Sequence, residues 1–169
     1  DTSADDPASL PWLIDLDQFV DDQSLDGLTE LVVRSSSTET ALNEAVALEL
    51  LDAAGLASQD AIAVQLTVNG GDPELRLVID NPDGTWMEEE FDDAGALYKA
   101  EASGDYSYRG DDPESYTDVF DQEAGKDDTD LTPLIDFLQF VNDSDDATFE
   151  AELAEHLDID AFATYLAYQ

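Results

Sequence analysis

The chain has 169 residues, of which 43 are Asp or Glu and only five are Lys or Arg, so its formal net charge at pH 7 is −38. Phosphate backbones are bound by clustered Lys and Arg, and the few scattered cations here exclude nucleic acid as an expected partner. No apolar run approaches the ~20 residues that span a bilayer. The lack of Cys excludes disulfides, thiol catalysis and Cys-based zinc sites.

The acidic residues are spread along the whole chain, and this pattern predicts adaptation to concentrated salt. At physiological ionic strength the Debye length is about 8 Å, so the surface charges repel one another and favour unfolding. In molar salt the length falls to about 3 Å, and the same charges become a hydrated coat. An acidic disordered protein is the alternative, but 43% of the residues are hydrophobic and lie in periodic runs, which disordered segments lack.

The order of the expected elements predicts an α+β fold, with a strand-rich N-terminal lobe followed by helices. Residues 1–10 are polar and contain Pro, so we expect a flexible acidic leader. Residues 11–169 are expected to form a single module, with mainly strands and two helices over 11–129 and helices over 130–169. The chain begins with Asp rather than Met, as expected of a processed product.

Strands dominate the expected elements before residue 81. Alternation of apolar residues and strong turn signals predict four of them, over residues 11–20, 27–34, 61–68 and 74–80. Asn69 and Gly70 make the turn of a hairpin between the last two strands. The helix between the second and third strands ends at Gly55, a residue typical of helix C-termini.

Asn81 and Pro82 predict the start of a short helix, because Pro is favoured in the first turn. Further short strands are expected over residues 96–101, 106–110 and 114–122. After Asp130 the apolar period becomes helical and predicts helices over 133–142, 147–157 and 158–169. Asp145 or Asp146 is expected to cap the middle one.

The apolar phase of each element predicts which large side chains are buried. In the helix over 133–142 the expected buried face carries Leu134, Phe137, Leu138 and Val141. The residues expected to be largely buried are Trp12, Trp86, Phe91, Phe137, Leu138 and Tyr165.

The sequence contains none of the common nucleotide-binding, metalloprotease or hydrolase motifs. His156 has no partner at a useful spacing and is expected at the surface or at a helix end. Clustered carboxylates offer the oxygen ligands of calcium, but none follows the EF-hand pattern, and such pairs arise by composition in so acidic a chain. These clusters are Asp15/Asp17, Asp92/Asp93, Asp111/Asp112 and Asp143–Asp146.

Basic residues are informative here because they are rare. In one interpretation each cation neutralises nearby acids. In the other, Lys99 faces a phosphate or an internal carboxylate such as Asp80. The five are Arg34, Arg76, Lys99, Arg109 and Lys126.

Several motifs in a fixed order resemble the CotH-type spore-coat kinase family over residues 12–168. An NG hairpin with the strand LRLVID is followed by GALYK, and then by YRGDDPESY at residues 108–116. Next come LIDFLQFVN in a helix and LDIDAFATYLA at residues 157–167. Each motif is weak alone, and their shared order carries the resemblance.

The resemblance implies an atypical kinase-like fold, ATP with Mg or Mn as cofactors, and phosphorylation of Ser in secreted or coat proteins. It implies cofactor-binding roles for Lys99 and Asp80, an extracellular or cell-surface location, and a protein partner or assembly. Asp80 replaces the family's strand Glu, Asn43 replaces a helix Arg, and Arg76 replaces a Tyr.

The family's catalytic and metal-binding Asp residues follow the YLA helix, which here is residues 165–167. The resemblance therefore assigns no catalytic or metal-binding residue, and we expect the chain alone to be inactive. The alternative is a non-enzymatic structural or interaction domain of an extracellular assembly.

We predict that the chain folds cooperatively in molar KCl or NaCl and loses its structure in dilute buffer, because only screening makes its charge tolerable. Circular dichroism measured against salt concentration checks this. A full native signal in low-salt buffer free of divalent ions would contradict it.

Overall fold

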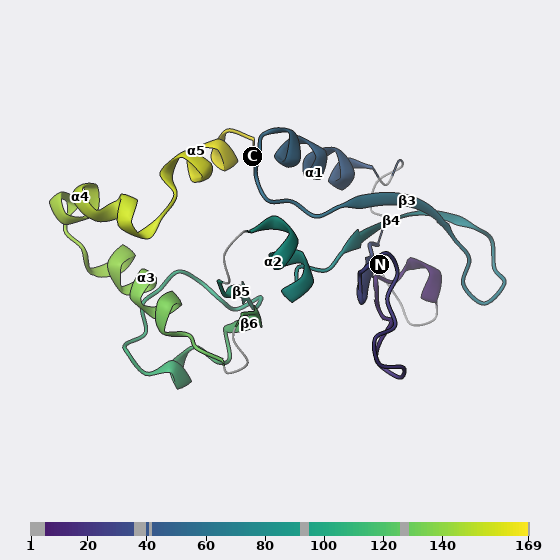
Figure 1. Ribbon diagram of the computed structural model, residues 1–169, viewed down its shortest axis with the longest axis horizontal. Helices are drawn as coiled ribbons and strands as arrows, with labels where there is room; N and C mark the ends of the chain where they lie inside the picture. The colour runs from purple at the N-terminus through teal and green to yellow at the C-terminus, as the bar shows by residue number, and fades with distance from the viewer. Residues whose placement is uncertain (1–5, 36–39, 41, 92–94, 126–128, 169) are drawn as a thin grey trace. The chain divides into compact units, whose positions relative to one another are not determined.

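The computed structural model describes residues 6–35, 40, 42–91, 95–125 and 129–168. The chain divides into two compact units, Asp1–Glu90 and Phe91–Gln169, each of which is described by itself (Figure 1). Both units combine antiparallel strands with helices, so the predicted α+β fold, strand-rich first and helical later, is confirmed. The kinase-like shape and the single module stay predictions.

A four-stranded antiparallel sheet forms the centre of the first unit, in the order β1-β2-β4-β3. All four strands were expected; β4 has the predicted bounds, whereas the other three are shorter than their sequence patterns. Their bounds are β1 Trp12–Asp15, β2 Glu30–Val33, β3 Ala61–Leu66 and β4 Glu74–Asp80. Val33, Leu77 and Ile79 from the two central strands are buried, with Trp86 as a further buried side chain of this unit.

Two predicted backbone signals of the first unit are confirmed. Asn69 and Gly70 both have positive φ, 53° and 74°, as tight hairpin turns with this pair require. Helix α1 (Asn43–Ala53), which contacts β3, ends in a Schellman motif (Figure 1). There the N–H of Gly55 donates to the carbonyl of Asp52 at 2.8 Å, and that of Leu56 to Leu51 at 3.0 Å.

The predicted start of the next helix is wrong by two residues. Helix α2 (Gly84–Glu90) begins after Asp83, whose carboxylate accepts a hydrogen bond from the N–H of Trp86 at 3.0 Å. An Asp that captures a free N–H of the first turn defines the start more strongly than a preceding Pro. Asn81 instead donates from its side-chain amide to Glu30 at 2.6 Å.

The second unit contains a two-stranded antiparallel sheet and three successive helices (Figure 1). Asp145 and Asp158 accept hydrogen bonds from N–H groups of the first turns of α4 and α5, so the predicted cap at Asp145 is confirmed. The bounds are β5 Leu97–Ala100, β6 Phe120–Ala124, α3 Thr132–Asp143, α4 Asp146–His156 and α5 Ile159–Ala167.

The strand expected over 106–110 is absent, and residues 113–115 form one turn of 3-10 helix before β6. The physical reason lies in the segment's own contacts. Gly110 has φ of 94°, and the hydroxyl of Tyr116 bonds to the backbone of this segment, which holds it as a loop.

Within the described residues, no helix is long and apolar enough to cross a membrane.

The buried face of α3 is rotated from the predicted one. Leu138 is buried and Leu134 packs against the core cluster, as predicted, whereas Val141 is 38% exposed and Phe137 is only half-buried. Ile135 is buried in addition, together with Leu131, which just precedes the helix. The buried three lie at positions i, i+4 and i+7, the spacing of one helix face. They pack with three residues that precede the helix, Tyr116, Val119 and Phe120.

Three of the six residues expected to be buried are exposed. Trp12 lies in the edge strand β1 and is 39% exposed, with its indole N–H donating to the carbonyl of Pro7. Phe91 and Tyr165 are 47% and 41% exposed. Local periodicity finds an apolar face but does not say whether another element covers it.

We predict that Leu138→Ala lowers the free energy of unfolding by about 2–5 kcal/mol, because it opens a cavity in a fully buried position. The matched control Val141→Ala, one turn away on the exposed side, changes it by less than about 1 kcal/mol. Denaturant unfolding at high salt measures both. Equal costs would show that the face is assigned wrongly.

Candidate functional site

Lys99 lies in β5 and forms an ion pair with Glu123 of β6. The Nζ atom of Lys99 is 2.9 Å from the Oε1 atom of Glu123, and the lysine side chain is 65% exposed. The ladder pairs Lys99 with Asp121, and Glu123 is the extra residue of β6 at the register shift between Gln122 and Ala124. The structure thus gives Lys99 a carboxylate partner that the sequence did not indicate.

The lysine ammonium is held in its charged form by the acids around it. The hydrogen bond that Lys99 donates to Glu123 raises the pKa of Lys99, and the charges of Glu123, Glu101 and Asp121 act in the same direction. A free triphosphate approaching this face meets one cation among three carboxylates. Contact with phosphate at Lys99 therefore requires concentrated salt or a metal ion to screen those carboxylates.

The opposite face of β5 fixes the strand in the unit. Tyr98 packs against the core cluster, and its hydroxyl donates to the backbone carbonyl of Asp130 at 2.7 Å. Because successive strand residues point to opposite faces, burial of Tyr98 directs Lys99 outward. The GALYK motif thus combines an inward anchor with an outward cation.

The loop that carries YRGDDPESY is organised by Tyr116, which is fully buried. Its hydroxyl accepts a hydrogen bond from the N–H of Arg109 at 2.6 Å and donates to the carbonyl of Gly110 at 2.9 Å. Asp112 caps the 3-10 turn, and Arg109 lies 3.5 Å from Asp105. Tyr116 was not among the residues expected to be buried, although its place at the end of a Gly- and Pro-containing motif was a usable signal.

Asp80 lies at the end of β4 in the first unit and is only 6% exposed. One carboxylate oxygen, Oδ1, has no hydrogen-bond partner among the described residues. Burial raises the pKa of Asp80 to about 6, and the charges of Asp60 and Glu89 add to the effect. The predicted pairing of Asp80 with Lys99 joins residues of different units and stays a prediction.

Arg76, which replaces a Tyr of the family, is the other buried charged residue described in the first unit, at 3% exposure. Its guanidinium donates to Glu74 at 2.7 Å and to the backbone carbonyl of Ala8. Arg76 thus ties the segment before β1 to β4, which is a structural role.

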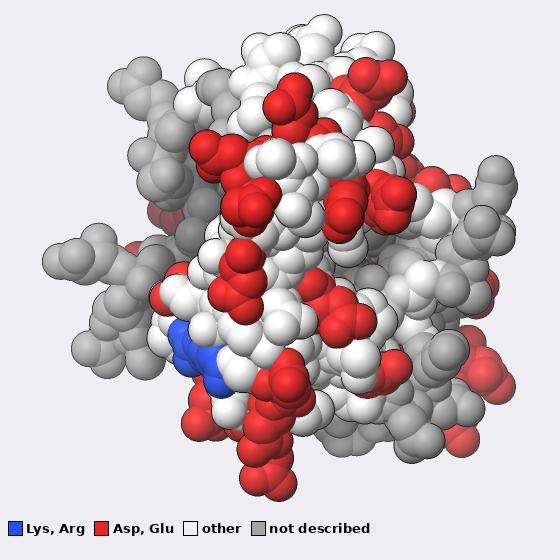
Figure 2. Space-filling view, turned by 90° about the vertical axis from the view of Figure 1, so that its left-hand side faces the viewer, with Lys and Arg blue, Asp and Glu red and all other residues white. Residues whose placement is uncertain are grey.

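Acids partner all four described cations. Arg34 pairs with Glu44 at 2.9 Å, and the partners of the other three are given above. Figure 2 shows the setting, with acidic side chains scattered over the visible face and only a small basic area. This supports the interpretation that the cations neutralise nearby acids. Lys126, Asp92 and Asp93 lie outside the described residues.

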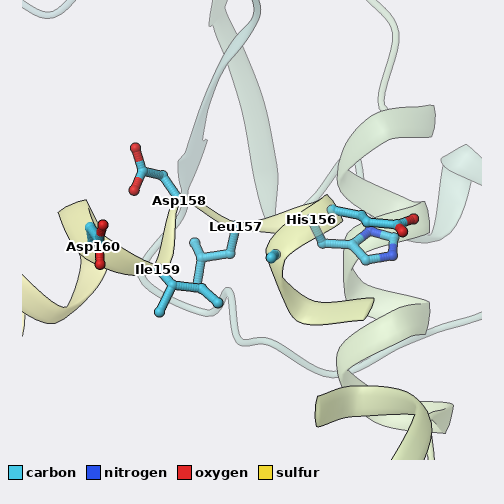
Figure 3. A pocket seen from close by; sticks show the side chains of 7 residues that line it. His156, Leu157, Asp158, Ile159 and Asp160 are labelled. Carbon is cyan, nitrogen blue, oxygen red and sulfur yellow. The ribbon is translucent and has the colours of Figure 1, made fainter. Parts of the chain in front are cut away.

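The remaining candidates from the sequence are engaged in local structure. His156 is the last residue of α4, as predicted, and its ring stacks on Phe140 with centroids 3.9 Å apart. It lines an open pocket of about 810 Å³ made by residues 154–160. Figure 3 shows His156 and Asp158 pointing in different directions, and Asp158 caps α5. This pocket brings no chemical groups together.

The acidic pairs considered for calcium use their oxygens locally. Asp15 accepts from the N–H of Gln18, Asp111 bonds to the hydroxyl of Tyr108, and Asp145 caps α4. The part of the chain that the structure describes contains no group of three or more His, Asp or Glu that could hold a metal ion.

Residues 6–169 match the family model described as CotH kinase protein. The match covers nearly the whole chain, and the chain belongs to the CotH kinase family. A search of curated proteins found no match.

We predict that Asp80→Asn stabilises the chain at neutral pH by about 1–3 kcal/mol and has little effect near pH 4. The pKa of Asp80 in the folded state, about 6, lies above the ordinary value of 3.8. Its contribution to stability is therefore full below that ordinary value and is lost as the pH rises through about 6. Unfolding across this pH range at fixed salt measures the difference.

The control is Asp72→Asn in the exposed hairpin turn, which removes the same charge without a buried carboxylate. Equal effects of the two substitutions at every pH would rule out a special role for burial at Asp80.

Proposed function

We propose that residues 6–169 act as a CotH-kinase-related module of a salt-adapted secreted or cell-surface protein. The family match supports the module, and the acidic composition supports its work in concentrated salt. The extracellular location is part of the proposal and follows from the resemblance to kinases of secreted and coat proteins.

The observation that carries a nucleotide-related role is the exposed ion pair of Lys99 and Glu123. In protein kinases a lysine held by a glutamate contacts the ATP phosphates, because the pair positions a cation without neutralising it fully. Lys99 has that kind of partner and stays open to solvent. We propose that it contacts the phosphates of a metal-bound nucleotide in concentrated salt.

The same 169 residues do not by themselves transfer phosphate in this proposal. Phosphoryl transfer is positioning combined with charge stabilisation by metal ions and their carboxylate ligands. The resemblance assigns neither the catalytic Asp nor the metal-binding Asp to this stretch. The acids around Lys99 lie on an exposed strand face, where solvent competes for them.

A second function is favoured by a different observation. All four described cations are satisfied by acids of the same chain, which is what a structural or interaction domain requires. In that case the ion pair of Lys99 only joins β5 to β6, and nucleotide has no site.

We predict that the purified chain, given labelled ATP, Mg or Mn and a Ser-rich protein at molar salt, transfers no label. Equilibrium dialysis under the same conditions detects weak, metal-dependent ATP binding that Lys99→Ala abolishes. Arg109→Ala is the matched control, because it removes another acid-paired cation of the same unit, and it leaves binding unchanged.

Three other results have distinct meanings. Stoichiometric transfer of label that is lost in Lys99→Ala would show a working minimal kinase site and refute the proposed inactivity. Absence of both transfer and binding would favour the structural or interaction domain. Equal loss of binding in Lys99→Ala and Arg109→Ala would show that the loss of ATP binding comes from the change in net charge and not from a specific contact of Lys99.

A further inference from the structure

Among the described residues, strand β1 is an edge of the first unit's sheet with no strand on its outer side, and three of its four residues are apolar. It lies at one end of the strand order, and its apolar residues Trp12, Leu13 and Ile14 are 39%, 58% and 39% exposed. Exposed apolar edge strands are templates for pairing with another strand, and soluble proteins usually protect them with charge, Pro or a covering element. Asp15 at the end of the strand and Pro11 directly before it give protection of this kind, and Trp12, Leu13 and Ile14 between them have none.

The hydrogen-bond register shows which backbone groups of β1 are open. The N–H of Leu16 donates to the carbonyl of Thr29 at 2.8 Å, just beyond the last ladder pair of β1 and β2. Hydrogen-bonded pairs alternate along an antiparallel ladder, so Trp12 and Ile14 also face β2. Leu13 and Asp15 therefore direct their N–H and C=O groups away from the sheet.

The other strands agree with this assignment. Leu13 is opposite Val32, and the N–H of Arg34 donates to the carbonyl of Leu77 in β4 at 2.8 Å. By the same alternation, Val32 also bonds to β4 and not to β1. Among the described residues, the backbone of Leu13 thus has no partner in the sheet.

We propose that β1 pairs antiparallel with β1 of a second copy of this chain, about a twofold axis at Leu13. In this register Leu13 is opposite Leu13 of the second copy, and Trp12 is opposite its Ile14. Asp15 is opposite Pro11, so no like charges oppose each other. Centring the axis on Asp15, the other outward-facing residue, would set two carboxylates directly opposite, which is destabilising.

The opposite edge of the sheet is a poorer candidate. Strand β3 is contacted by α1. By the alternation argued above, its outward backbone groups belong to Ala61, Ala63 and Gln65, because Asp80 donates to the carbonyl of Asp60. These side chains are small or polar, and Ile62 is the one large exposed apolar side chain printed for this strand. The edge at β3 therefore offers less apolar area than Trp12, Leu13 and Ile14 offer at β1.

Salt decides whether this pairing occurs. Two copies with a net charge of −38 each repel strongly in dilute buffer. In molar salt the screening length is about 3 Å, and apolar contacts across β1 are no longer opposed by distant charges. The dimer is therefore expected in the same range of salt in which the chain folds.

Sedimentation velocity of the full chain in about 3 M KCl tests the proposal. We expect a concentration-dependent dimer whose Kd rises roughly tenfold or more in Leu13→Pro. This substitution removes the outward N–H of residue 13 but no hydrogen bond between β1 and β2. Ala63→Pro is the matched control, because it removes an outward N–H from the other edge, and it leaves the dimer unchanged. Circular dichroism at the same salt verifies folding.

Leu13→Lys is a second variant, for the case that Leu13→Pro fails to fold. This substitution sets two like charges opposite each other at the twofold axis, so it should also weaken the dimer. A chain that stays monomeric at all concentrations overturns the proposal, even if its β1 edge binds a labelled peptide of residues 10–16. A dimer that survives folded variants at Leu13, or is lost in Ala63→Pro alone, overturns it as well.

Discussion

Electrostatic self-repulsion is the force that this chain must overcome to fold. A charge of −38 on 169 residues opposes every contact that makes the chain compact. The apolar burial that opposes it is small among the described residues: Val33, Leu77, Ile79 and Trp86 in the first unit, and the cluster around Tyr116 and Leu138 in the second. The few cations each offset part of this repulsion, since all four that the structure describes pair with an acid.

Several Asp residues also make interactions within the fold that offset part of the charge repulsion. Asp83, Asp145 and Asp158 cap helices, where a negative charge meets the positive end of the helix dipole. Asp80 is the exception, because it is buried without a partner for one oxygen and so disfavours its own ionisation. Asp80 is present at a buried position where its charged form is disfavoured, although the chain has many acids at its surface. The end of β4 is therefore a region to study by mutagenesis.

Elements with strong local signals could be predicted from the sequence. Asn69-Gly70, Gly55 and Asp145 each impose a turn or a helix end through their own backbone or side chain, and the structure has all three. Predictions that depended on tertiary contacts did less well. Val141 and Tyr165 have apolar periodicity yet are exposed, and the partner of Lys99 came from β6 and not from a residue that the sequence suggested. Ladder register decides such pairings, and a single sequence does not specify it.

Neutralising surface acids tests whether charge repulsion is the cause of the proposed salt requirement. Asp136, Glu150, Glu152 and Glu155 are exposed on α3 and α4, and a variant with Asn or Gln at these positions keeps the helix caps and ion pairs described above. If repulsion governs folding, the KCl concentration at the folding midpoint falls in this variant, because less charge needs screening. A midpoint equal to that of the parent chain would contradict the account and assign the effect of salt to apolar burial or specific ion binding.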